Sequence, residues 1–173
     1  EALALDPSID RQLSVAVTLA LAGEAAQAKR LLAAVVAQFP VWTQVQTVIS
    51  PGVGAAIELR SGAPDKAVEI LRASVPYERN NQLSIYLRGQ AYLKAGSGKE
   101  AAAEFQKILD NRGVSRASVV YPLSYVGLAR AAVRSGDTGK ARKAYQDFFA
   151  IWKDADADIP ILLEAKREYA KLG

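Results

Sequence analysis

Apolar residues recur along this chain at intervals of three and four, which is the spacing of one face of an α-helix. Segments such as "EAAQAKRLLAAVVAQF" and "KEAAAEFQKIL" combine that spacing with residues of high helix propensity. The chain shows neither the alternation typical of half-buried strands nor the Asn-Gly or Asp-Gly pairs of tight hairpins. The pattern therefore predicts an all-α fold.

Four glycines divide the helical segments at similar intervals. Each follows Ala or Ser at the end of a helix-forming run, and the four are 39, 34 and 40 residues apart: Gly23, Gly62, Gly96 and Gly136. Glycine adopts the left-handed backbone conformation at no steric cost and is common at helix ends. Each glycine therefore predicts a turn between two helices.

Other residues keep fixed distances from these glycines. Seven residues before each glycine stands a small residue: Ala16, Ala55, Gly89 and Ala129. Five residues after it stands an alanine: Ala28, Ala67, Ala101 and Ala141. Four residues later comes a large apolar residue: Leu32, Leu71, Phe105 and Tyr145. A small residue lets two helices approach closely, and residues four apart share one helix face. This register predicts four helix pairs, at approximately 9–40, 42–76, 82–111 and 118–152.

The two longer intervals contain extra residues. The first set, 41–50, is apolar enough to lengthen a helix, and we expect Pro51 to kink or break that helix. The second set, "NRGVSRASVV" at 111–120, predicts a loop.

The last segment, 158–172, predicts a helix that caps the stack, with Asp158 as its N-cap and Pro160 in its first turn. Its apolar stripe is Ile161, Leu162, Ala165, Tyr169 and Leu172, and its expected solvent side is Glu164, Lys166, Arg167, Glu168 and Lys171. Together, 1–173 predict a single repeat domain.

Composition excludes several kinds of chemistry. The chain contains no Cys and no His, which excludes disulfides, the usual zinc sites, Cys nucleophiles and His-based triads. No apolar run is long enough to span a bilayer, and no signal peptide is recognisable. Because the chain begins at Glu1 and lacks Met, we expect a fragment or a processed form.

The net charge of +4 is unevenly distributed. Residues 1–59 carry 3 basic and 5 acidic side chains, whereas residues 60–173 carry 19 and 13. A basic surplus in the C-terminal two-thirds favours acidic partners, although a solvated helical surface is the simpler interpretation. The surplus is too small and too sparse to predict nucleic-acid binding.

Three short motifs resemble ligand sites but lack required residues. "SGKE" at 97–100 and "TGK" at 138–140 lack the leading glycine of a phosphate-binding loop and are better explained as helix–helix turns. "DADAD" at 154–158 resembles the start of a calcium loop, but Ile159 and Ala165 replace the required Gly and Glu. Helix capping explains these aspartates better. We therefore expect no catalytic, cofactor or metal site, and no enzymatic activity in this chain.

The stretch "YLRGQAYLKAGSGKEAAAEFQKIL" at 86–109 resembles a tetratricopeptide repeat, a 34-residue helix–turn–helix unit. Gly89, Tyr92, Ala101 and Phe105 match that pattern, whereas Ile85 and Arg88 replace its Trp and Leu. "YVGLARAAVRSGDTGKARKAYQDFF", from Tyr125, also matches, with Leu128, Ala129, Ala141 and Tyr145. The segment 51–75 diverges most, because Gly54 and Glu58 replace the Leu and the aromatic residue.

Nearly the whole chain is similar to the C-terminal repeat region of large bacterial signalling proteins. In these, a serine/threonine kinase or winged-helix domain precedes a membrane span and the repeats. The motifs of those two domains do not occur here. The resemblance implies a sensor or scaffold region on the extracytoplasmic side of a membrane-anchored protein, with a cytoplasmic regulator as the alternative.

The resemblance also implies a right-handed α-α superhelix, whose concave groove is lined by the first helix of each repeat and binds a peptide or partner domain. The repeat register places these residues in the groove: Arg60, Tyr86, Gln90, Leu93, Lys94, Val126, Arg130, Val133 and Arg134. Arg60, Lys94 and Arg134 hold equivalent positions and suit an acidic peptide or a C-terminal carboxylate, although Leu21 interrupts the row and the paired asparagines of a carboxylate clamp are absent. Cations near helix C-termini also occur because of the helix dipole. The alternative function is a structural spacer or homodimer whose groove is filled by 41–50.

Overall fold

The computed structural model describes residues 9–113 and 118–173, and within these ranges every regular element is helical. The predicted all-α fold is therefore confirmed. The chain forms two compact units, 1–91 and 92–173, and the boundary between them falls within helix α6 (Gln82–Lys94).

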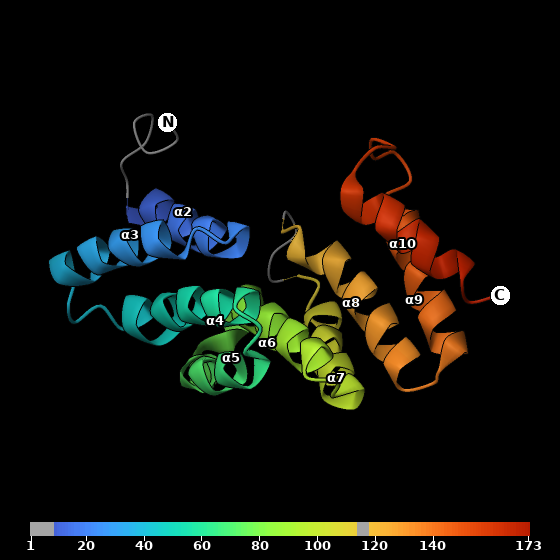
Figure 1. Ribbon diagram of the computed structural model, residues 1–173, viewed down its shortest axis with the longest axis horizontal. Coiled ribbons are helices and arrows are strands. Elements are labelled where there is room, and N and C mark those ends of the chain that lie inside the picture. The colour runs from blue at the N-terminus through green and yellow to red at the C-terminus, as the bar shows by residue number, and fades with distance from the viewer. Residues whose placement is uncertain (1–8, 114–117) are drawn as a thin grey trace. The chain divides into compact units, whose positions relative to one another are not determined.

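The first unit contains two helical hairpins and the start of α6 (Figure 1). Its elements are α2 (Ile9–Ala22), α3 (Ala25–Gln38), a π-helical turn η1 (Val45–Ile49), α4 (Ser50–Arg60), α5 (Pro64–Leu71) and a 3₁₀ segment η2 (Arg72–Asn80). Helix α2 packs against α3 and α4, and α4 packs against α5.

The second unit continues from the end of α6 through α7 (Gly98–Asp110), α8 (Val120–Arg134), α9 (Thr138–Ile151) and α10 (Pro160–Ala170). Helix α8 packs against both α7 and α9, and α10 lies beside α9 (Figure 1).

The four predicted turn glycines share one backbone geometry. Their φ angles are +97°, +83°, +84° and +76° at Gly23, Gly62, Gly96 and Gly136, which confirms the left-handed conformation. At each turn, the residue after the glycine donates its amide to the carbonyl of the residue five positions earlier, at 2.8–2.9 Å. At Gly23, for example, Glu24 N donates to the Leu19 carbonyl. The carbonyl of the residue after the glycine then accepts from the amide four residues later, at the alanine of the register. One glycine turn therefore ends one helix and starts the next.

The residues of the register lie in the core. The small residues seven before the glycines and the alanines five after them are buried, most of them completely. Of the large residues, Leu71 and Phe105 are fully buried, Tyr145 is 1% exposed and Leu32 is partly buried. The predicted core face of each second helix is thus confirmed.

Phe105 of α7 packs directly onto Gly127 of α8. A Cβ atom at Gly127 would lie 2.5–2.7 Å from the Phe105 ring, closer than any real contact. The same two helices approach closely at Gly98, where a Cβ atom would lie 3.0 Å from the Ala131 carbonyl oxygen. The contact between α7 and α8 therefore depends on the missing side chains of two glycines.

The insertion at 41–50 lengthens a helix as predicted, since η1 runs directly into α4, and the helical hydrogen bonding changes from π to α just before Pro51. Pro51 lies in the first turn of α4, directly after η1, where Ser50 N donates to the Val45 carbonyl five residues back. A proline is tolerated there because its missing N–H needs no helical partner. Val45 is fully buried and packs with Leu13 and Val35, so part of this insertion belongs to the core of its own unit. In the second insertion, residues 114–117 lie outside the described residues.

Two expectations for the last helix need correction. Helix α10 begins at Pro160 with Ile159 as its N-cap residue, so Asp158 is not the N-cap. Glu168 is partly buried and bonded to α8 and α9 rather than solvated. The apolar stripe is confirmed, since Leu162 and Ala165 are buried.

Arg88, which replaces an apolar residue of the repeat pattern, is buried in an ion pair. Its guanidinium contacts the Glu78 carboxylate of η2, and the two side chains are 5% and 13% exposed. Removing one partner of such a pair leaves an uncompensated charge in the interior, whereas replacing both with apolar groups avoids the desolvation penalty.

We predict that Gly127→Ala lowers the free energy of unfolding by about 1–3 kcal/mol, because the new methyl group collides with Phe105. Gly139→Ala is the control, because its Cβ atom meets Asp137 Oδ1 at 3.8 Å and nothing nearer. That variant should be neutral or more stable, by up to about 1 kcal/mol, through helix propensity. Urea unfolding of both variants measures the difference; equal stabilities would contradict the close packing.

We predict that Glu78→Gln lowers the free energy of unfolding by about 3–5 kcal/mol, because Arg88 keeps a buried charge without its counter-ion. The double variant Arg88→Met/Glu78→Leu should recover most of this loss. Glu69→Gln is the matched control, since the Glu69–Arg72 pair is 65% and 72% exposed and should contribute less than about 1 kcal/mol. Thermal unfolding of the three variants tests the order.

Candidate functional site

The three predicted basic positions stand at equivalent helix ends. Arg60 is the last residue of α4, Lys94 of α6 and Arg134 of α8, each two residues before a turn glycine, and all three are exposed. A cation there interacts favourably with the helix C-terminus. Arg60 belongs to the first unit, and Lys94 and Arg134 belong to the second.

Arg60 lies against another part of its own unit. Its guanidinium Nη2 is 3.5 Å from the position that a Cβ atom of Gly23 would occupy, so it covers the turn between α2 and α3. The carbonyls at the C-terminus of α2 face that turn and carry partial negative charge. The Arg60 guanidinium therefore lies close to the C-terminus of α2 as well as to the end of its own helix.

The other predicted groove residues differ in what surface they offer. Val126 and Leu93 are 2% and 7% exposed, so the core leaves little of either side chain for a partner. Tyr86 and Gln90 are partly buried on α6, and Val133 is 47% exposed in the last turn of α8. The predicted residues with most accessible surface in the second unit are thus Lys94, Val133 and Arg134.

Arg130 is held by two glutamates of α10. Its Nε atom lies 3.0 Å from Glu168 Oε2, and one terminal nitrogen lies 3.1 Å from Glu164 Oε2. Glu168 Oε2 also accepts a hydrogen bond of 2.6 Å from the Tyr145 hydroxyl. One carboxylate thereby joins α8, α9 and α10.

This network changes the acid–base properties of two members. Burial alone would lower the pKa of Arg130, but the hydrogen bond and charge of Glu168, with the charge of Glu164, raise the pKa overall. Burial raises the pKa of Tyr145, and its hydrogen bond to Glu168 raises it further. Arg130 is therefore cationic and Tyr145 neutral at any ordinary pH.

Sequence reasoning missed Glu164, Glu168 and Tyr145 as a set. The glutamates were assigned to solvent and the tyrosine to the core, although the glutamates are four residues apart and thus share one helix face. That spacing, one turn apart on a helix with an adjacent apolar stripe, was the available signal. It does not specify which cation the pair meets.

Two open hollows lie elsewhere on the surface. One, of about 670 Å³, is in the first unit and is lined by Trp42, Thr43, Gln44, Val48, Ile49, Tyr77 and Asn81. The other, of about 770 Å³, is in the second unit and is lined by Arg112, Gly113, Ser118, Val119, Tyr121, Pro122, Ile151 and Trp152. Neither brings together an acid, a base and a nucleophile, and their described walls are largely apolar or uncharged.

The "DADAD" aspartates lie in the exposed connection before α10. In the described part of the chain, no group of three or more acidic residues is placed to hold a metal ion. Among the described helices, none has both the length and the apolar character to cross a bilayer.

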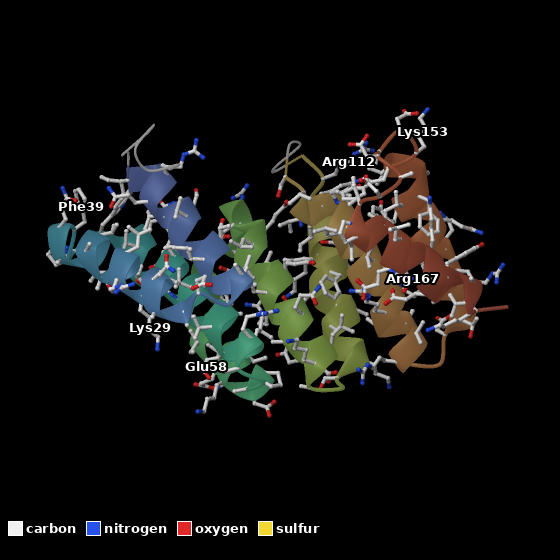
Figure 2. All side chains as sticks on the ribbon, turned by 45° about the horizontal axis from the view of Figure 1, so that its top comes forward. Lys29, Phe39, Glu58, Arg112, Lys153 and Arg167 are labelled. Carbon is white, nitrogen blue, oxygen red and sulfur yellow. The ribbon has the colours of Figure 1, made fainter. Side chains whose placement is uncertain are left out.

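Charged side chains cover the outer surfaces of the helices (Figure 2). Lys29 extends from α3, and Arg167 is carried by α10.

Comparison of the chain with family models, curated proteins and solved structures found no match.

The raised pKa of the Tyr145 hydroxyl predicts a loss of stability at alkaline pH. Above pH 10, the ordinary pKa of tyrosine, an unfolded Tyr145 loses its proton while the folded one keeps it, so rising pH favours unfolding. Tyr125 adds to this loss, because burial and the Tyr121 hydroxyl raise its pKa to about 12. We predict that stability falls between pH 10 and 12, and that Tyr145→Phe makes this fall shallower. Urea unfolding at successive pH values tests the slope; an identical slope would contradict the prediction.

Proposed function

We propose that this chain is a non-catalytic helical-repeat module that binds a protein or peptide, with the right-handed superhelical arrangement of tetratricopeptide repeats over 1–173. The observation that carries the proposal is the repeated turn: four glycines with the same left-handed φ, the same amide-to-carbonyl bond and the same buried alanine. Chains of such equivalent hairpins form extended binding surfaces.

The proposed contact surface is the C-terminal end of the first helix in each hairpin of the second unit. Lys94 and Arg134 are exposed cations at equivalent positions, and Val133 adds an exposed apolar side chain. Such a surface suits a peptide with acidic side chains or a free C-terminal carboxylate, which accepts charge-assisted hydrogen bonds. Arg60 is a weaker candidate, because it already covers the turn at Gly23.

The resemblance to bacterial signalling proteins supports a further proposal about context. The chain would serve as the sensor or scaffold region of a larger protein, in which catalysis or DNA binding belongs to another domain.

Binding of displayed peptides tests the proposed function. A peptide library is selected on the wild-type chain, and the affinity of recovered peptides is measured by calorimetry. We predict that Lys94→Glu/Arg134→Glu weakens binding at least tenfold, because both contacts become repulsive. Native circular dichroism is required of the variant, since Arg134→Glu removes a favourable charge from a helix end.

Lys29→Glu/Lys66→Glu is the matched control, because it makes the same change in net charge at exposed positions on second helices. It should bind as the wild type does. Equal weakening in both variants would indicate a non-specific charge effect and would contradict the proposed surface. Recovery of no peptide, together with a dimer on size exclusion, would favour the structural alternative.

A further inference from the structure

The face of α8 and α9 that lies beneath α10 has the composition of a docking surface for an acidic helix. Arg130 and Arg142 lie on it with Tyr145 and Phe149, and these four residues are called the α10-facing surface. Arg142 lies 5.0 Å from the centre of the Tyr169 ring and also donates to the Gly173 carbonyl. The Tyr169 ring makes edge contacts with Tyr145 and Phe149 at 6.2 and 5.7 Å. Two cations therefore accompany an aromatic patch.

Helix α10 complements this surface with charge as well as apolar area. Glu164 and Glu168, one turn apart, both contact Arg130. Of the α10-facing surface, sequence reasoning places only Arg130 in the predicted partner groove, and α10 occupies that residue in the structure.

Helix α10 buries few of its apolar side chains completely. Its fully buried residues are Leu162 and Ala165, whereas Leu163 is 40% exposed. Its ionic contacts are partly solvated, since Arg130 is 27% exposed, Glu168 29% and Glu164 55%. The N-cap residue Ile159 makes no side-chain bond to the helix, and the connection from α9 consists of turns with exposed residues. An 11-residue helix with two fully buried side chains, whose other contacts are partly exposed, belongs to the low-stability end of a structure.

We infer that the α10-facing surface is a second partner site and that α10 occupies it as a built-in competitor. The partner is an amphipathic helix of another protein, which carries two glutamates one helical turn apart and displaces α10. Displacement needs a partner helix that buries more apolar area than α10 while keeping both carboxylates on Arg130. The inference rests on the proposed function only in assigning a protein partner. It concerns the surface in contact with α10, and neither Lys94 nor Arg134 is among the residues that define it.

The test uses a fluorescein-labelled peptide with the sequence of residues 158–173 as the partner helix. Anisotropy measures its binding to the full chain and to Glu164→Arg/Glu168→Arg, which repels α10 from Arg130 while leaving the α10-facing surface intact. We expect the variant to bind the peptide about tenfold or more tightly than the wild type does, because the internal competitor is released. Arg130→Ala added to that variant should weaken binding about tenfold or more, because the glutamates of the peptide lose their counter-ion.

Hydrogen exchange of the wild-type chain gives an independent measurement that needs no variant. Amides of α10 should exchange at least about a hundredfold faster than those in the middle of α8 and α9. Equal protection of the three helices, or equal peptide affinity before and after release of α10, would overturn the inference. The released variant could instead form a concentration-dependent dimer that the peptide dissociates. That result would identify the occupant of the surface as the α10 of a second copy, and would overturn the inference as stated. Loss of binding only in Lys94→Glu/Arg134→Glu would count against this second site while leaving the proposed function in place.

Discussion

The left-handed glycine turn is the constraint on which the rest of this structure depends. At each of the four turns, one amide bonds back to the carbonyl five residues earlier, and the carbonyl of the same residue starts the following helix. The direction and phase of both helices are thereby set within a few residues. Small residues seven before the glycine and alanines five after it then meet in the core, as Ala129 and Ala141 do around Gly136. The packing of the two helices within each hairpin is therefore repeated along the chain, because the turn that joins them is repeated.

The features predicted well from sequence are those decided within one hairpin. Turn glycines, buried alanines and the core position of Phe105 follow from local spacing, since residues about four apart share a helix face whatever surrounds them. The prediction for Asp158 is wrong because a helix start depends on which backbone groups need partners. The π turn before Pro51 could not be predicted, because no local sequence pattern specifies it. The partner of Arg130 was missed because Glu168 is 38 residues away and comes from a helix whose docking no local rule describes.

Net charge proved a poor guide to which cations face a partner. Arg88 is buried against Glu78, Arg130 is bonded to α10, and the guanidinium of Arg60 covers a turn of its own unit. The first two offset the charge of a glutamate within their own unit. Part of the basic surplus of this chain therefore contributes to its internal contacts.

The contact between Gly127 and the Phe105 ring also limits how this sequence can drift. A side chain at one position is tolerated only if the ring at the other becomes smaller, since the two occupy the same volume between α7 and α8. Neither substitution is favourable first, because one creates a collision and the other a cavity. Related chains that share this hairpin pair should therefore keep both residues or exchange both, and the two columns of an alignment should vary together.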